Sequence, residues 1–163
     1  MYKKILVGID GSENSMRAAI KAAKMGKISS GKIIVYHSVK HRLPPRKIPL
    51  LFPFNIGSES PTYDIPEPDY VDIQEQYEEA GKQVLKKALK KLKAEAGDDI
   101  NVEAKLVLDI DPAGYAVDQT TNGDVDLVVV GCQGHHSKLR EIFLGTVAEK
   151  ILNRVDSDVL VVR

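Results

Sequence analysis

Short apolar segments alternate with amphipathic ones along most of this chain. Five segments rich in valine, isoleucine and leucine have the length and composition of buried strands, and they lie at 5–9, 33–36, 102–108, 126–130 and 159–162. Apolar side chains at steps of three and four predict helices over 12–27, over 71–96, from 111–112 onward and over 146–154. Strands that alternate with helices predict an α/β fold. We expect one Rossmann-like domain over 1–163, an open parallel sheet with helices on both faces.

Capping residues mark the ends of the expected helices. Ser12 stands where a helix N-cap is expected, and Pro112 follows Asp111 at a first helical position. Gly31 and Gly97 each follow a helical segment, where glycine commonly ends the helix. These signals agree with the hydrophobic pattern.

Residues 40–69 interrupt this pattern. Seven of the eight prolines of the chain lie there, and proline removes backbone donors, so we expect a long loop without regular structure. The loop begins basic, ends acidic and is apolar in the middle. Long loops in compact domains are usually functional. Three roles stay open: a lid over a site, a docking segment for an unknown protein partner, or packing onto its own domain.

Composition narrows the class of protein. The chain has 23 basic and 23 acidic side chains, so no net charge draws it to nucleic acid or to an anionic membrane. Its one cysteine, Cys132, excludes an internal disulfide framework. The first residues do not resemble a signal peptide, and no segment has the apolar length of a membrane helix. We therefore expect a cytoplasmic protein.

Two sequence features are expected to meet at one end of the sheet. Asp10 follows the first strand, and Gly131 follows the fourth. Ligands of doubly wound sheets bind beyond the carboxyl ends of strands, at the point where the strand order reverses. If the order is 3-2-1-4-5, Asp10 and Gly131 border one crevice.

The glycine-rich segment after the fourth strand suits a phosphate. Gly131 and Gly134 allow the backbone to approach a ligand closely, and Gly145-Thr146 opens a helix whose first N–H groups favour an anion. The alternative needs no ligand, because residues 146–149 (TVAE) match a capping box that starts a helix. For Asp10, likewise, the alternative is a carboxylate that caps a turn.

Other binding and catalytic motifs are missing or weak. No P-loop and no dinucleotide fingerprint are present, and residues 8–12 (GIDGS) do not match the S-G-G-x-D-S loop of adenylating enzymes. Cys132, His135 and His136 supply only three candidate zinc ligands, so we expect no metal site. Neither a catalytic triad nor a carboxylate pair can be assigned, and we therefore expect no catalytic residues and at most slow ATP hydrolysis.

Five segments, all outside the proline-rich loop, carry a resemblance that covers the rest of the chain. They are residues 7–12 (VGIDGS), 111–113 (DPA), 126–134 (DLVVVGCQG), 139–152 (LREIFLGTVAEKIL) and 159–162 (VLVV). In combination they resemble the universal stress protein family. The resemblance implies a five-stranded parallel sheet in the order 3-2-1-4-5. It also implies a homodimer through the last strand, Val159 to Val162, and such an edge strand is apolar enough to pair.

The resemblance also implies an adenine-nucleotide site for ATP, AMP or ADP, with Mg²⁺ held through Thr146 and the phosphates. Asp10 would bond the ribose or the adenine edge. The implied nucleotide-binding residues are Gly8, Ile9, Asp10 and Ser38 near the base, Val130 and Gly131 at the adenosine, and Gly134, Gly145, Thr146 and Val147 at the phosphates.

One spacing separates two functions within this family. The ATP-binding branch follows G-x2-G-x9-G-[ST], whereas ten residues, 135–144, lie between Gly134 and Gly145 in this chain. The glycines and Thr146 favour a nucleotide-dependent regulatory switch. The extra residue favours the alternative, a dimeric interaction module that binds no nucleotide.

Overall fold

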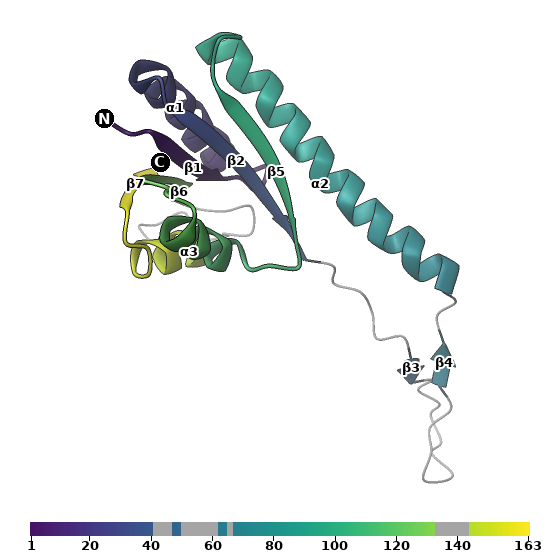
Figure 1. Cartoon of the computed structure of the whole chain (residues 1–163). Helices are drawn as coiled ribbons and strands as arrows, with labels where there is room; N and C mark the ends of the chain where they lie inside the picture. Colours follow the sequence, from purple (N-terminus) through teal and green to yellow (C-terminus); the bar gives the residue numbers. More distant parts are fainter. Residues whose placement is uncertain (41–46, 50–61, 65–66, 133–143) are drawn as a thin grey trace.

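Five parallel strands and four helices make up the main body of the protein (Figure 1). The computed structural model describes residues 1–40, 47–49, 62–64, 67–132 and 144–163. Its strands are β1 (Lys4–Gly8), β2 (Lys32–Val39), β5 (Val102–Leu108), β6 (Leu127–Gly131) and β7 (Asp158–Val162). Its helices are α1 (Glu13–Ser29), α2 (Glu67–Ala96), α3 (Pro112–Asn122) and α4 (Thr146–Leu152).

The sheet has the order β5-β2-β1-β6-β7, which is 3-2-1-4-5 when its strands are numbered along the chain. All four pairings are parallel. The predicted α/β class and strand order are therefore confirmed. The boundaries shift by a few residues: β2 extends to Val39, and α4 ends at Leu152 rather than at Arg154.

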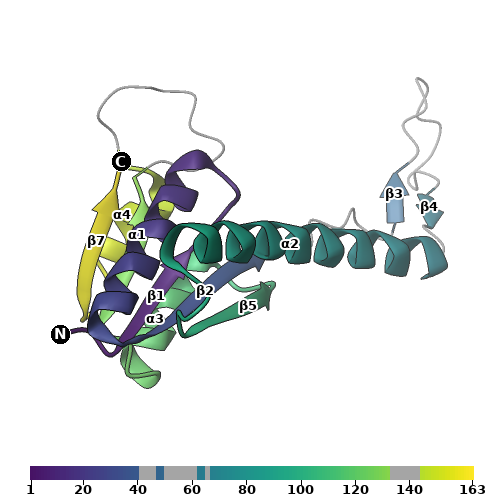
Figure 2. The same cartoon turned by 90° about the horizontal axis from the view of Figure 1, so that it is seen from above.

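Helices cover both faces of the sheet (Figure 2). On one face, α1 and α2 pack over a core that includes Val7, Val35 and Leu92. On the other face, α3 and α4 pack over a core that includes Leu6 and Val128. Alternate residues of the central strands β1 and β6 thus enter opposite cores. This double coverage explains why these strands are continuous apolar runs in the sequence.

Two of the predicted helix caps are formed. The Ser12 hydroxyl accepts a hydrogen bond from the backbone N–H of Ser15 at the start of α1. The Asp111 carboxylate accepts one from the backbone N–H of Gly114, with Pro112 as the first residue of α3. Each cap satisfies a backbone donor that a helix leaves without an internal partner.

The prediction of no regular structure across residues 40–69 is wrong in part. β3 (Lys47–Pro49) pairs antiparallel with β4 (Thr62–Asp64), and α2 begins at Glu67 rather than at Val71. Pro49 is compatible with a short edge strand, which needs no donor on its outer side. Pro68 lies in the first helical turn, where its missing N–H is not needed. The apolar middle of the segment falls outside the described residues.

Helix α2 has two unlike halves. At about 1.5 Å per residue, its 30 residues extend about 45 Å, well beyond the strands beside it (Figures 1 and 2). From Gly81 onward every third or fourth side chain is buried, with Leu85, Ala88 and Leu92 in the core. From Val71 to Ala80 no side chain is fully buried. Only the second half is therefore part of the folded core.

None of the helices in the described ranges is both long enough and apolar enough to cross a bilayer.

We expect a core substitution in the second half of α2 to destabilise the protein far more than a matched one in the first half. Leu92→Ala removes a fully buried side chain and should lower the free energy of unfolding by about 2–5 kcal/mol. Val71→Ala, at a position 42% exposed, should change it by less than about 0.5 kcal/mol. Urea denaturation followed by circular dichroism measures both. Equal losses would show that the first half also packs into the core.

Candidate functional site

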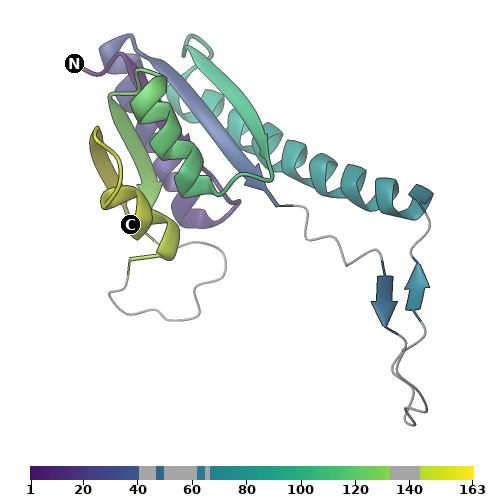
Figure 3. The ribbon, with the colours of Figure 1, turned by 60° about the horizontal axis from the view of Figure 1, so that its bottom comes forward.

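The carboxyl ends of β1 and β6 lie side by side in the middle of the sheet. Residues 5–7 of β1 pair with residues 127–129 of β6, while β1 pairs with β2 on its other side. The chain leaves β1 toward β2 through α1 on one face, and it reaches β7 from β6 through α4 on the other face. This is the point where strand order reverses, and Figure 3 turns that end of the sheet toward the viewer.

A hydrogen-bonded turn follows β1. The Asp10 carboxylate oxygen Oδ1 accepts from the Ser12 N–H at 3.0 Å. The buried Ser15 hydroxyl accepts from the Asp10 N–H and donates to the Ser12 carbonyl. Gly11 has a φ of +83°, which favours glycine. The carboxylate is thus held by the turn, as the turn-capping interpretation of Asp10 requires, and Asp10 follows the carboxyl end of β1.

Gly131 lies against the first turn of α1. A Cβ added to it would be 2.8 Å from the Asn14 carbonyl carbon and 2.8 Å from the Ser15 nitrogen. The next two backbone bonds continue this close packing: Cys132 N–H donates to the Val162 carbonyl, and Gly145 N–H donates to the Cys132 carbonyl, both at 2.7 Å. The second of these bonds closes the loop from 132 to 145 at its base, so the end of β6 and the start of α4 lie next to one another.

The first turn of α4 begins at this closure. Gly145 is the N-cap, and no side chain caps the turn in the described part of the chain. The capping box proposed for residues 146–149 is therefore not formed, because Thr146 is the first helical residue rather than the cap. Thr146 and Val147 are both exposed. The first turn of α4 thus lacks the side-chain bond that a capping box would supply.

Hydrogen bonds that the sequence did not predict join the carboxyl ends of β1 and β2. The His37 ring nitrogen Nδ1 lies 2.7 Å from the Ile9 carbonyl oxygen, and the Ile9 N–H donates to the Tyr36 carbonyl. Nothing in the sequence distinguished His37 beyond its place at the end of a strand. The neighbouring Ser38 hydroxyl donates to the Ile110 carbonyl. Ile9 is buried in the α1–α2 core, so both its side chain and its backbone are engaged by the protein.

Two of the predicted nucleotide-binding positions, Gly8 and Val130, also have packing roles. A Cβ on Gly8 would be 2.9 Å from the Tyr36 ring, whose hydroxyl donates to the Pro112 carbonyl. Burial raises the pKa of this tyrosine well above its ordinary value. Val130 is buried in the α3–α4 core. Gly8 and Val130 therefore contribute to the packing at the ends of β1 and β6.

A charged cluster connects three elements near the same end of the sheet. The Asp111 oxygen Oδ1 lies 3.5 Å from Lys40 Nζ and 4.0 Å from Lys150 Nζ. Partial burial raises the pKa of this carboxyl, but the Gly114 N–H and the two ammonium groups outweigh it, so the pKa lies below its usual range. The cluster joins β2 and α4 to the start of α3.

Most of the predicted nucleotide-binding residues come together in this structure. Gly134 lies outside the described residues, and so do His135 and His136, the two histidines weighed as zinc ligands beside Cys132. In the described ranges no three His, Cys, Asp or Glu side chains are grouped to hold a metal ion. The predicted residues that border the β1–β6 end or the strand ends beside it are Gly8, Ile9, Asp10, Ser38, Val130, Gly131, Gly145, Thr146 and Val147.

Comparison with known proteins agrees with this architecture. The universal stress protein from Lactobacillus plantarum, UspA, has a solved structure with a TM-score of 0.72 at 16% identity, covering 99% of this chain and 98% of its own. The universal stress protein from Archaeoglobus fulgidus, solved in complex with dAMP, has a TM-score of 0.60 at 19% identity, covering 99% and 98%. At these identities the likeness shows the fold.

Sequence comparison identifies the family. Universal stress protein MJ0531 from Methanocaldococcus jannaschii is 30% identical over 164 residues, an alignment that covers all of this chain and 83% of the relative. The profile of the universal stress protein family matches residues 1–53 and 54–163. The chain therefore belongs to the universal stress protein family.

Proposed function

We propose that this protein binds an adenine nucleotide, ATP or else AMP or ADP, at the β1–β6 crevice and acts as a regulatory switch in a stress response. One observation carries the proposal: the closure of the 132–145 loop brings Gly131 and the uncapped start of α4 to the point where strand order reverses. Backbone N–H groups at a helix start favour phosphate. The dAMP complex of the A. fulgidus family member supports an adenine nucleotide.

The adenosine would lie toward β1 and β2. The Asp10 carboxylate, which the Ser12 N–H already orients, would accept a hydrogen bond from the ribose or the adenine edge. Gly8, Ile9 and Ser38 would line the base, and Val130 and Gly131 would lie beneath the adenosine. Since the bulky Ile9 and Val130 side chains belong to the two cores, the strand ends are held rigid beneath the ligand.

The phosphates would lie over the start of α4. Gly134, Gly145, Thr146 and Val147 would donate backbone N–H groups, and the Thr146 hydroxyl would contact phosphate or a Mg²⁺ ion bridged through phosphate. Thr146 and Val147 are exposed, so a ligand can reach this turn without displacing the core. We also propose a cytoplasmic location, as expected from the sequence.

A switch is better supported than a fast catalyst. The Oδ1 of Asp10 accepts the Ser12 N–H, and Asp111 is held by Lys40 and Lys150. A general base must be poised to take a proton from water, whereas these carboxylates are held as hydrogen-bond acceptors and ion-pair partners. We therefore expect hydrolysis to be slow or absent and nucleotide occupancy to be the signal.

The ten-residue span between Gly134 and Gly145 supports a second candidate, an interaction module without nucleotide. In that case the 40–69 segment would contact an unknown protein partner. Either function is compatible with a homodimer. β7 is an edge strand of the sheet, and we propose that Val159 to Val162 pair with the same residues of a second copy.

Val147→Glu should weaken ATP binding about tenfold or more while leaving the fold intact. A carboxylate in the first turn of a helix is favourable to the helix dipole, but it repels a phosphate bound there. Leu152→Glu, at the exposed far end of the same helix, is the matched control. Calorimetric titration with ATP and Mg²⁺ measures the affinity, after a check for co-purified nucleotide. Equal ATP affinities for the two variants would show that the phosphates do not bind at the first turn of α4.

Asp10→Asn should weaken nucleotide binding about tenfold with little change in melting temperature. The amide oxygen can still accept from the Ser12 N–H, but the charged acceptor for the ribose or adenine is lost. Titration with adenosine alongside ATP separates this half of the site from the phosphates. An unchanged affinity would show that Asp10 only caps its turn and does not bind the ligand. A large fall in melting temperature would make the variant uninformative about the ligand.

The protein should sediment and scatter light as a dimer or larger assembly at micromolar protein concentration, because an apolar edge strand left unpaired favours association. A monomer under these conditions would contradict pairing through β7. Static light scattering over a dilution series measures the mass directly.

A further inference from the structure

Charge is segregated along α2. Its first half carries six carboxylates and no basic residue, at Glu67, Asp69, Asp72, Glu75, Glu78 and Glu79. Its second half carries six lysines before the next acidic residue, at Lys82, Lys86, Lys87, Lys90, Lys91 and Lys93. A helix dipole favours acids at the start and lysines at the end, but that effect is confined to the first and last turns. The segregation here runs through the whole helix.

The boundary between the two charges lies beside the edge strand β5. A Cβ on Gly81, between the last carboxylate and the first lysine, would be 2.7 Å from Leu106 of β5 and 2.7 Å from Val39 of β2. The acidic half of α2 projects beyond the carboxyl end of β5 from this level, and the lysine half packs over the sheet (Figure 2). β5 is the outermost strand of the sheet on this side.

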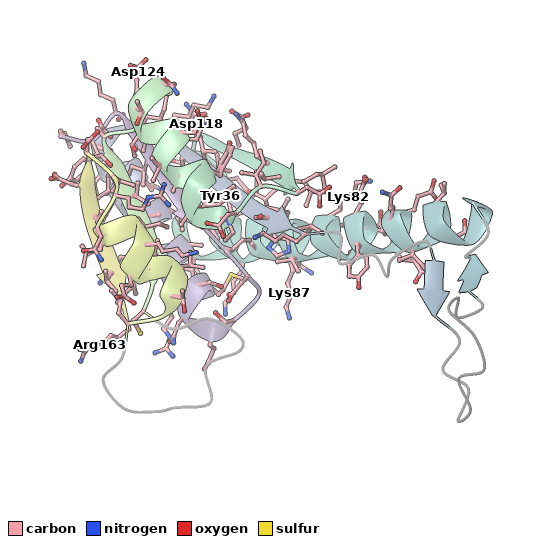
Figure 4. The ribbon with its side chains drawn as sticks, turned by 90° about the horizontal axis from the view of Figure 1, so that it is seen from below. Tyr36, Lys82, Lys87, Asp118, Asp124 and Arg163 are labelled. Atoms are coloured by element: carbon pink, nitrogen blue, oxygen red, sulfur yellow. The ribbon has the colours of Figure 1, made fainter. Side chains whose placement is uncertain are left out.

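One flank of α2 faces the free edge of β5. Lys24 of α1 approaches Glu95 at 3.8 Å, which identifies the flank that faces α1. Helical geometry then assigns Val71, Glu75, Lys82, Lys86 and Lys93 to the opposite flank, over β5. In Figure 4, Lys82 and Lys87 point away from one another, on opposite flanks of α2.

This flank has charge and apolar surface without a partner in the described part of the chain. The lysines of this flank, Lys82, Lys86 and Lys93, are exposed, and none of them makes an ion pair with the described residues. Val71, Leu108 and Ile110 are 42%, 39% and 48% exposed near the overhang of α2 and the end of β5. The β3–β4 ribbon lies on the other side of α2 from β5, so it leaves this edge open (Figures 2 and 4).

We propose that the β5 edge and this flank of α2 bind a second copy of the same chain, related by a two-fold axis near the level of Leu106. β5 would pair antiparallel with β5 of the other copy, and the two α2 helices would run antiparallel on the same face. The acidic half of each α2 would then lie along the lysine half of the other. The single charge pattern of one chain supplies both sides of this contact, which is why a second copy is the occupant.

The spacing of the elements suits such a contact. α2 lies over the β2–β5 pair, since Gly81 touches both strands. If the two β5 strands lie about 4.8 Å apart across the axis, each α2, which lies over the β2–β5 pair, is about 4.8 Å from the axis. The two helices are then about 10 Å from one another, which is a normal helix-packing distance. This interface uses the sheet edge opposite to β7, so it is independent of the homodimer proposed above.

A charge-exchange experiment tests the proposal. One variant reverses the acidic half (Asp72→Lys with Glu75→Lys), and another reverses the lysine half on the β5 flank (Lys86→Glu with Lys93→Glu). The control, Lys87→Glu with Lys91→Glu, makes the same charge change on the other flank. Sedimentation velocity at low salt measures the mass of each protein and of an equimolar mixture of the first two, and circular dichroism verifies helix content.

We expect each of the first two variants to sediment with a smaller mass than wild type, because like charges then face one another across the β5 edge. The mixture should recover the wild-type mass, since the reversed halves are complementary again, and the control should sediment like wild type. Raising the salt concentration should dissociate the wild type and the mixture alike. The proposal fails if the variants keep the wild-type mass, if the control loses mass equally, or if the mixture does not recover.

Discussion

The backbone of Gly131 approaches the first turn of α1 so closely that no side chain fits between them. The rest of the candidate site depends on this contact, because it fixes the end of β6 against the start of the helix that follows β1. From the same point, Cys132 bonds to β7 through the Val162 carbonyl and to the start of α4 through the Gly145 N–H. Four elements that are distant in sequence are thus joined within a few backbone atoms. A methyl group at Gly131 would push them apart, so the glycine is needed for the fold whether or not a ligand is bound.

Other residues of the candidate site, like Gly131, have a structural role besides the proposed role in binding. Gly8 makes room for the Tyr36 ring, which in turn bonds the start of α3. Asp10 holds the turn before α1 and is also the residue that we propose bonds the ribose or the adenine edge. Residues that mark the family in sequence therefore serve the fold first, and a nucleotide would use a geometry that already exists. The start of α4 is the exception, because its uncapped turn gains no evident stability from Thr146 and Val147, whose side chains are exposed.

The two edges of the sheet offer different kinds of contact. β7 is a short apolar edge beside α4, whereas β5 lies under a helix with opposite charges at its two ends. α2 runs antiparallel to β5, so its acidic half projects at the end of the sheet that also holds the candidate site. Pairing across β5 about a two-fold axis would direct the sites of the two copies in opposite directions. Nucleotide occupancy and assembly would then be distinct properties of one small domain.

The sequence by itself determined the fold class, the strand order through the family resemblance, and the caps at Ser12 and Asp111, because these depend on local periodicity and on turn chemistry. It also placed Asp10, Gly131 and Gly145 at one end of the sheet. Only the tertiary structure decided that β3 and β4 pair within the proline-rich segment, since pairing depends on contacts across the segment. It likewise decided that Thr146 does not cap α4 and that His37 bonds Ile9. These outcomes depend on which backbone atoms the packed sheet brings together, and that information is not local to any stretch of the chain.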